Sequence, residues 1–219
     1  MEALIYGTAG IFPVFHGFFC KFSAPRRSNM MVMADTIDDE HLVEQFNRGD
    51  ESAFDIIVER YSSDIAALAN RLLGWSGEVE DVTQDIFLAA FLGLKKFRCE
   101  CSLKTWLFTI TVNKCRSYRY KRMLRRRRIS QAADKAFLAS AGTADKTPMD
   151  SEAFERVRRA IKALPAKYRE PVVLRYLQEL PTDEISRILG ISKNALQVRL
   201  NRARARLRED LAEEIKEKL

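Results

Sequence analysis

The sequence predicts an all-α protein made of two small helical domains, and three observations lead to this prediction. Residues that favour helices are abundant, whereas the 219-residue chain has only 9 Gly and 6 Pro. Apolar residues recur every three or four positions in two long blocks, which is the spacing of amphipathic helices. Between the blocks, residues 129–150 are small and polar without a strong period, which is typical of a flexible linker.

The composition narrows the class of function. The chain carries 37 Lys plus Arg against 30 Asp plus Glu, a formal charge of +7 that favours a polyanionic partner. Hydrophobic residues make up 47% and charged residues 31%, which excludes a collagen-like chain, a wholly disordered chain and a long membrane bundle.

The first thirty-three residues form an extension that differs from the rest of the chain. Residues 3–22 are largely apolar but are interrupted by glycine, proline and histidine, and basic residues follow them. A start codon placed too far upstream, or a disordered tail, explains residues 1–33 most simply. The alternative is a membrane anchor formed by residues 3–22, and without that anchor no membrane contact is expected.

The first block, residues 34–128, begins with two helices that face a common core. The turn residues Gly49-Asp50-Glu51-Ser52 separate a short helix from a longer one. The apolar positions of these helices are Leu42, Val43 and Phe46, followed by Phe54, Ile57, Tyr61, Ile65, Leu68 and Leu72.

A further helix is predicted over residues 78–94, with an acidic face. Its apolar stripe consists of Val79, Val82, Ile86 and Ala90. Its opposite face carries Asp81, Gln84, Asp85 and Leu88. An acidic face suits binding to a basic protein surface, and a solvated helix back is the alternative.

Residues 97–128 combine aromatic rings with positive charge. Nine of the fifteen residues from Lys114 to Arg128 are basic and none is acidic. Like charges repel along a helix, so this run is stable only beside an anion, and nucleic-acid phosphate is the natural one. The interleaved rings suit stacking on single-stranded bases, and Asn113 has a donor and an acceptor for a base held in a pocket. A disordered basic arm is the alternative.

The second block, residues 151–219, contains the spacing of a helix-turn-helix. Thr182 or Asp183 is expected to cap a short helix that ends at Gly190, and Ser192 to cap a longer one. The outward-facing residues near the start of the longer helix are Lys193, Asn194, Gln197, Val198 and Asn201. Such side chains contact base edges and phosphates in the major groove. A plain helical hairpin with solvated arginines is the alternative.

Together, these motifs resemble those of the extracytoplasmic-function sigma factors, the small two-domain members of the sigma-70 family of bacterial transcription initiation factors. The resemblance runs from about Asp39 to Leu211. In the first block it is carried by Leu42-Val43-Glu44, Gly49-Asp50, Ala53-Phe54, residues 80–87 (EDVTQDIF), Phe97-Arg98, Thr105-Trp106-Leu107, Ile110, Val112 and Asn113. In the second block it is carried by Leu164-Pro165, Arg169, Leu174-Arg175, Glu184-Ile185, residues 189–192 (LGIS), Arg199-Leu200 and Arg202-Ala203-Arg204.

The resemblance implies an RNA polymerase sigma factor whose first block is sigma region 2 and whose second block is sigma region 4. The residues implied to bind core RNA polymerase are Asp81, Gln84, Asp85 and Leu88. Those implied to open and hold the minus-ten element of promoter DNA are Phe97, Leu103, Trp106, Asn113, Lys114, Ser117, Tyr118 and Lys121. Those implied to read the minus-thirty-five element are Lys193, Asn194, Gln197, Val198, Arg199, Arg202 and Arg206.

Two departures from the family pattern affect the expected specificity. Gln197 stands where the family often has a basic residue, and glutamine favours adenine over the guanine that Arg or Lys prefers. We therefore expect an unusual minus-thirty-five sequence. Residues 99–103 (CECSL) replace a more usual glycine, acid, serine and aromatic, and Leu103 has no ring to stack on a base.

The cysteines favour an intracellular, reducing compartment. Cys20, Cys99, Cys101 and Cys115 lack the spacing of a disulfide framework and are interpreted as free thiols. A metal or redox role of Cys99 and Cys101 is the alternative, although neither His16 nor His41 completes a ligand set by its spacing.

Two other classes of function are weighed against a sigma factor. A conventional helix-turn-helix regulator explains the second block but leaves the acidic and basic helices of the first without a role. An enzyme acting on nucleic acid needs a nucleophile, base or metal set, and the sequence has no HExxH, GxSxG or P-loop pattern. We therefore expect a non-enzymatic cytoplasmic protein without cofactor or metal. Its partners are core RNA polymerase and promoter DNA, and the resemblance allows an anti-sigma factor as well.

Overall fold

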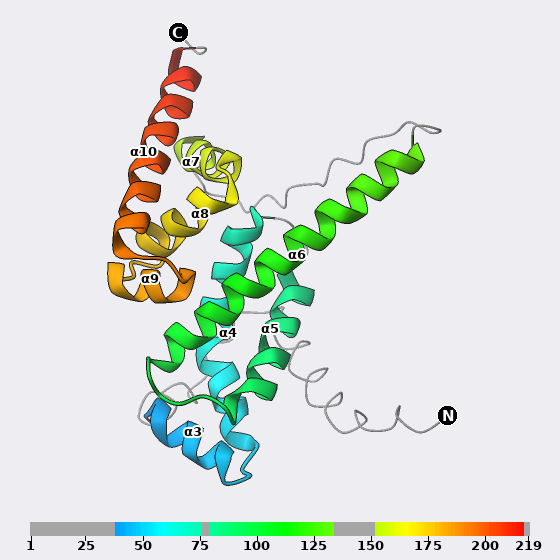
Figure 1. Cartoon of the computed structure of the whole chain (residues 1–219), viewed down its shortest axis with the longest axis vertical. Helices are drawn as coiled ribbons and strands as arrows, with labels where there is room; N and C mark the ends of the chain where they lie inside the picture. Colours follow the sequence, from blue (N-terminus) through cyan, green and yellow to red (C-terminus); the bar gives the residue numbers. More distant parts are fainter. Residues whose placement is uncertain (1–37, 76–78, 134–151, 217–219) are drawn as a thin grey trace. The chain divides into compact units, whose positions relative to one another are not determined.

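The computed structural model describes residues 38–75, 79–133 and 152–216, and Asp38–Leu219 form one compact unit (Figure 1). The described residues form helices joined by turns, with no β-strand among them, so the predicted all-α class is confirmed. The predicted extension 1–33 and most of the predicted linker lie outside the described residues.

The first block forms a helical bundle built around α4. Its elements are α3 (Asp39–Asn47), α4 (Ser52–Leu73), α5 (Val79–Leu94) and α6 (Leu103–Ala133). α4 packs against α3, α5 and α6, and α5 packs against α6. The predicted apolar stripes form the core, because Leu42, Ile57, Leu68 and Ile86 are fully buried. Burial of each such side chain stabilises the fold by roughly 1.5–3 kcal/mol.

Two glycines shape the ends of α3 and α4. Gly49 has φ +101°, which permits the sharp turn predicted between these helices, and the Asp50 carboxylate accepts a hydrogen bond from the Ser52 N–H (3.0 Å). Gly74 ends α4 with φ +78°. A Cβ atom at Gly74 would lie 3.2 Å from a Lys162 side-chain carbon, so this turn also permits the close approach of α7.

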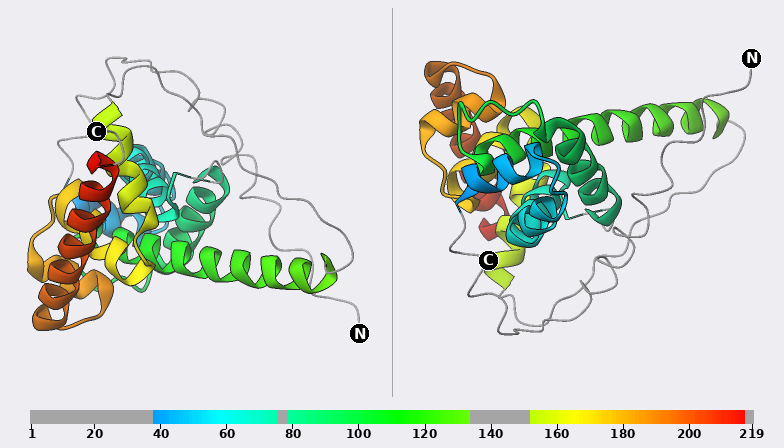
Figure 2. Two further views of the ribbon diagram at one scale, coloured as in Figure 1. Left: turned by 90° about the horizontal axis from the view of Figure 1, so that it is seen from above. Right: turned by 90° about the horizontal axis from the view of Figure 1, so that it is seen from below.

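α6 has two halves with different surroundings. The first half is packed into the bundle, and its last buried side chain is that of Cys115. The second half continues beyond the ends of the neighbouring helices α4 and α5 (Figures 1 and 2). α6 ends at Ala133, so the first residues of the predicted linker, 129–133, are helical. A basic helix that leaves its bundle exposes its charges to solvent and to an anionic partner.

The second block contains α7 (Glu152–Ala163), α8 (Ala166–Val172), the π-helical turn η1 (Val173–Leu177), α9 (Thr182–Leu189) and α10 (Lys193–Lys216). α10 packs against α7, α8 and α9. Pro171 lies inside α8, two residues before the start of η1, and cannot donate the backbone hydrogen bond of an α-helix. The Gln178 N–H donates to the Val173 carbonyl (3.0 Å), a π-type bond, and the chain then turns into α9.

The helix-turn-helix predicted within this block is present. Gly190 ends α9 with φ +65°, and the Ser192 hydroxyl accepts a hydrogen bond from the Ala195 N–H (3.2 Å) at the start of α10. One detail of the prediction is wrong. Neither Thr182 nor Asp183 caps α9, because the helix begins at Thr182 and its N-cap residue, Pro181, makes no side-chain capping bond. The core of the motif contains Ile185, Ile188, Leu189, Leu196, Leu200 and Ala203.

Candidate protein and nucleic-acid interfaces

α5 presents an acidic and apolar surface to solvent, as predicted. Asp81, Gln84 and Asp85 are exposed, and Leu88 is 41% exposed in the next turn. The buried side of the same helix carries Val82, Ile86, Phe87 and Ala90. The four exposed side chains therefore lie on one helix face, where the leucine can pack and the carboxylates can pair with a basic partner.

This surface extends one turn further than the sequence analysis predicted. Leu92 is 65% exposed and borders a cavity of about 210 Å³ at the contact between α3 and α5. The adjacent Phe91 ring packs edge-on against Phe46 and Phe54, with ring centroids 5.2 Å and 5.1 Å apart. Leu92 follows Leu88 at the i+4 spacing, which is the signal by which the sequence could have identified it.

The start of α6 is held by an aromatic pair. The rings of Phe97 and Trp106 lie 5.1 Å apart between centroids, and both residues are partly exposed. A Cβ atom at Gly93 would lie 3.2 Å from the indole, so this glycine allows Trp106 to rest against α5. Leu103 is only 2% exposed and packs in the core, so its side chain is not accessible to a base in this structure.

The exposed face of α6 contains most of the residues that the family resemblance implied for the minus-ten element. Asn113, Ser117 and Lys121 are exposed, and Lys114 and Tyr118 are partly exposed. The helical spacing places Asn113, Ser117 and Lys121 in one row. The Asn113 side-chain oxygen accepts a long hydrogen bond from Arg116 (3.5 Å), which orients the amide beside a positive charge.

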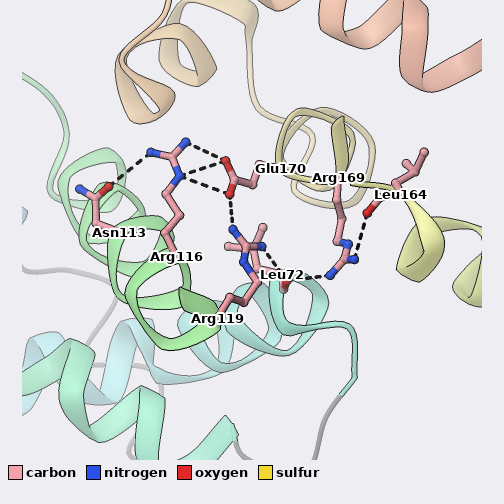
Figure 3. Close-up of polar contacts among 7 residues, drawn as sticks. All are labelled: Leu72, Asn113, Arg116, Arg119, Leu164, Arg169 and Glu170. Atoms are coloured by element: carbon pink, nitrogen blue, oxygen red, sulfur yellow. Dashed lines mark hydrogen bonds and ion pairs between the residues drawn. The ribbon is translucent and has the colours of Figure 1, made fainter. Parts of the chain in front are cut away.

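A buried carboxylate from the second block meets this basic helix. Glu170 of α8 has a side chain only 4% exposed, yet it is paired with two arginines of α6 (Figure 3). Arg116 donates from Nε (3.1 Å) and from Nη2 (2.7 Å) to Glu170 Oε2, and Arg119 donates from Nη2 to Oε1. Such charge-assisted, multidentate bonds are among the stronger polar contacts in proteins.

Two arginines also donate hydrogen bonds to a backbone carbonyl at the carboxyl end of α4. The Leu72 carbonyl accepts hydrogen bonds from Arg119 Nη1 (3.1 Å) and Arg169 Nη1 (3.2 Å), and Arg169 also donates to the Leu164 carbonyl (3.0 Å) (Figure 3). Burial, followed by the charge of Arg119, lowers the pKa of the Arg169 guanidinium. The last carbonyls of a helix attract cations, so α4, α6 and α8 are joined at this point.

Three further contacts join the two blocks. Arg71 of α4 donates to the Leu177 carbonyl (2.7 Å), and Thr105 of α6 donates to Glu184 of α9 (3.1 Å). The Arg158 guanidinium lies 5.3 Å from the centroid of the Trp75 ring. No sequence pattern predicts these contacts, because they join residues far apart in the chain.

The start of α10 presents a polar surface to solvent. Asn194 and Gln197 are exposed, and Val198 is 48% exposed. Lys193 is also exposed and forms an ion pair with Asp183 of α9 (2.7 Å). This pair joins the two helices of the motif across their turn.

The exposed arginines further along α10 also contact aromatic side chains of α8 and η1. Arg199 is partly exposed, and Arg206 lies 5.0 Å from the centroid of the Tyr168 ring in α8. A hydrogen bond from Arg202 lowers the pKa of the Tyr168 hydroxyl, and Arg204 donates to Tyr176 (2.8 Å). Arg202 and Arg206 therefore help to attach α10 to α8, a role that the sequence did not predict.

The described cysteines are free thiols in different surroundings. Cys99 is exposed, Cys101 is partly exposed, and Cys115 is buried, which raises the pKa of its thiol to about 12. Within the described ranges, no three His, Cys, Asp or Glu side chains gather as a metal site would require. The same part of the chain contains no helix long and apolar enough to span a membrane.

Two families match the two blocks. Sigma-70 region 2 matches residues 57–128, and sigma-70 region 4 matches residues 154–207. The ECF RNA polymerase sigma-E factor of Escherichia coli (strain K12) is 31% identical over 179 residues, covering 78% of this chain and 93% of that protein. The sigma-E factor of Haemophilus influenzae is 29% identical, covering 78% of this chain and 94% of that protein.

Two solved structures resemble the described fold. CnrH, solved in complex with the cytosolic domain of CnrY, is 30% identical, with a TM-score of 0.58 over 80% of this chain and 97% of that chain. The sigma factor RpoE of Bartonella quintana, solved with the anti-sigma factor NepR, is 26% identical, with a TM-score of 0.56 over 73% and 96%. The two family matches, the sequence relatives and the Bartonella structure therefore indicate the same family.

Proposed function

The chain belongs to the extracytoplasmic-function sigma factors of the sigma-70 family, and from this premise we propose how its surfaces divide the work of transcription initiation. α5 binds core RNA polymerase, α6 opens and holds the minus-ten element, and the start of α10 reads the minus-thirty-five element. The observation that supports this division is chemical. The exposed face of α5 is acidic and apolar, that of α6 is basic and aromatic, and that of α10 is polar.

The polymerase contact rests on Asp81, Gln84, Asp85 and Leu88, with Leu92 added from the structure. The carboxylates steer α5 toward a basic surface and reject wrong partners by repulsion. Leu88 and Leu92 supply apolar area to the centre of the interface, where most of the binding energy of protein contacts concentrates.

The minus-ten contact rests on the exposed row of α6. Asn113 holds one base in a pocket through its amide, Tyr118 stacks on a base, and the neighbouring cations bind phosphates. Unstacking a base costs a few kcal/mol, and the pocket and stacking offset that cost. The Phe97 and Trp106 rings support this surface from beneath, and the buried Leu103 side chain helps to fix the start of α6 by packing in the core. The remaining members are Lys114, Ser117 and Lys121.

The minus-thirty-five contact rests on the first turns of α10. Lys193 and Asn194 bind phosphates at the edge of the major groove, and Gln197 and Val198 contact bases. The Gln197 amide suits adenine, and Val198 suits the methyl group of thymine. Arg199 and Arg202 extend the contact with bases, and Arg206 binds a phosphate.

Specificity arises when polymerase holds both DNA contacts together. Each contact alone is weak and salt-dependent, because phosphates supply most of its affinity. Polymerase fixes the two modules at a set separation, which raises the effective concentration of the second contact once the first has formed. The free protein therefore binds duplex promoter DNA weakly.

The chain performs no covalent chemistry of its own in this proposal, since RNA synthesis belongs to polymerase. Its site of action is the cytoplasm, where its two macromolecular partners meet. CnrH and the Bartonella RpoE were each solved with a protein partner. By analogy with the Bartonella complex, we expect an anti-sigma factor to bind this chain.

In-vitro transcription with core polymerase on a library of promoters tests the proposal. Addition of the chain is expected to produce transcripts from a subset of templates that share two elements at a constant spacing. Purified core polymerase alone is the control. A chain that neither co-purifies with polymerase nor directs it to any start site would contradict the proposal.

A further inference from the structure

We propose that Cys99 and Cys101 are a reversible oxidation site, at which a peroxide joins the two thiols in a disulfide and thereby slows promoter opening. Both residues lie in the loop between α5 and α6, and the surfaces proposed for polymerase and DNA use neither thiol. The effect on opening rests on the proposed function, because it assumes that the start of α6 acts on the minus-ten element. The oxidation itself does not depend on that assumption.

The two thiols are accessible and lie in a bent part of the chain. Cys99 is exposed, Cys101 is partly exposed, and both are free. The backbone bends at residues 99–101, and Cys99 has φ +54°, which is in the left-handed region. Cα atoms two residues apart are separated by about 7 Å in an extended chain, so a bend brings them into the range of about 4.4–6.8 Å that disulfides use.

The surroundings of the two thiols give them different roles. Cys99 is the more exposed and meets a dissolved peroxide first. Burial raises the pKa of the Cys101 thiol, and the charge of Arg187 opposes this rise only in part. Cys101 therefore carries less thiolate than a fully exposed thiol, and the thiolate is the reactive form. Cys99 is thus the thiol that reacts with peroxide, and Cys101 is the thiol that closes the disulfide.

The reaction balances with a single molecule of hydrogen peroxide. The Cys99 thiolate attacks one peroxide oxygen, the O–O bond breaks, and the departing hydroxide takes up the proton released by the thiol. The product is water and a sulfenic acid on Cys99. The Cys101 thiolate then attacks the Cys99 sulfur, so that the S–S bond forms as the S–O bond breaks, and a second water leaves. Two electrons and two protons have then passed from the thiols to the peroxide.

The loop that contains the pair is attached at both ends to the surface proposed for the minus-ten element. Before the pair, the Phe97 ring packs against Trp106 of α6, with 5.1 Å between the ring centroids. After the pair, the Ser102 hydroxyl accepts a hydrogen bond from the Thr105 N–H (3.1 Å) at the start of α6. A disulfide closes a ring that contains only residues 99–101, which restricts their backbone. A loop that cannot adjust beside an unstacked base positions that base less well, so opening slows.

The small size of the ring also makes the disulfide reversible. Strained and exposed disulfides are more easily reduced than structural ones. In a reducing compartment such disulfides form transiently and act as redox sensors. The third described cysteine, Cys115, takes no part, because it is buried and burial raises the pKa of its thiol to about 12.

Mass spectrometry tests the site without reference to DNA. The full chain is treated with hydrogen peroxide, and trypsin then releases the peptide 99–104 by cutting after Arg98 and Lys104. We expect the wild-type peptide to lose the mass of two hydrogen atoms and to regain it with dithiothreitol. Cys101→Ser should stop at the sulfenic acid, which dimedone labels on Cys99. Cys20→Ser keeps the pair and is the matched control, with the wild-type mass change.

The effect on promoter opening is measured after the peroxide has been removed and core polymerase added. Permanganate footprinting should show opening about fivefold slower with the oxidised chain than with the reduced chain, because the loop no longer orders around the base. Affinity for polymerase should not change. Cys99→Ser should open promoters at the rate of the reduced wild type, whether or not it has been treated with peroxide.

Three outcomes would overturn the inference. These are an unchanged mass of the wild-type peptide, a disulfide from the loop to Cys20, and an opening rate that formation of the loop disulfide does not alter. Failure of the untreated chain to direct transcription would instead contradict the proposed function, and it would leave the mass change of the peptide unaffected.

Discussion

The two helices proposed to bind DNA are in different states in the free chain. In α6, Arg116 and Arg119 are engaged by Glu170, and Arg119 also donates to the Leu72 carbonyl. In α10, Asn194, Gln197 and Val198 are exposed at the start of the helix. Two cations beside the proposed minus-ten row of α6 are therefore occupied by the chain itself, whereas Asn113, Ser117 and Lys121 of that row are exposed, as is the start of α10.

This difference has a physical reason. A duplex-reading helix gains little from nonspecific sites, because its base contacts require the correct sequence. A basic helix binds any polyanion, since its affinity comes from phosphates. Because Glu170 already pairs with Arg116 and Arg119, these two cations are less available to a polyanion than the exposed basic residues of α6.

The largest expected effect concerns the exposed acidic surface of α5, which binds neither DNA element in the proposal. Asp85→Arg should weaken binding to core polymerase by about 100-fold, or roughly 3 kcal/mol, because it places a cation against a basic partner. Fluorescence anisotropy with labelled chain measures this affinity. Glu59→Arg, an equal charge change on the exposed side of α4, is the control and should have little effect. Equal loss in both variants would mean that net charge, rather than α5, determines binding.

The next largest effect distinguishes promoter opening, which we assign to α6, from polymerase binding, which we assign to α5. Asn113→Ala should slow promoter opening by about 30-fold, because a flipped base loses its pocket at a cost of roughly 2 kcal/mol. Affinity for core polymerase should stay at the wild-type value. Permanganate footprinting of unpaired thymines measures opening. Asn47→Ala, an exposed asparagine of α3, is the control. Loss of polymerase binding together with opening would contradict the proposed division between α5 and α6.

A smaller effect tests base reading by the exposed start of α10. Gln197→Ala should reduce discrimination at one base pair of the minus-thirty-five element by about tenfold, at the low end of the 1–3 kcal/mol of a bidentate contact. Transcription from templates that vary only at that element measures the change. Glu209→Ala, further along α10, should leave the preference intact. An unchanged preference in Gln197→Ala would mean that another residue reads the base.

Local patterns predicted the individual helices well, for physical reasons. The apolar spacing identified the buried stripes of α3, α4 and α5, and Gly49, Gly190 and Ser192 marked turns that depend on single residues. The buried residues of α6 were not identified in this way. The end of α6 was predicted five residues early, because a basic run without apolar period gives no signal of where a helix stops.

Contacts between the blocks could not be predicted from the sequence. Glu170 lies in α8 among charged and apolar residues, and nothing local indicates that its carboxylate is buried against α6. The contacts of the exposed Arg202 and Arg206 with Tyr168 were missed for the same reason, because helical periodicity predicts which face a residue lies on but not which residue of another helix it meets. Leu103 was assigned to DNA by resemblance, yet its burial depends on the packing of α6.

The salt dependence of single-strand binding tests most directly whether Glu170 occupies Arg116 and Arg119 in the free chain. Each phosphate contact steepens the slope of log affinity against log salt by about 0.7 for single strands, so releasing Arg116 and Arg119 should steepen it by about 1.4. We therefore predict that Glu170→Gln has a slope steeper than wild type by about 1.4. Glu44→Gln, which removes one charge from an exposed pair with Arg48, is the control and should equal wild type. Identical slopes in folded wild-type and Glu170→Gln proteins would contradict the account.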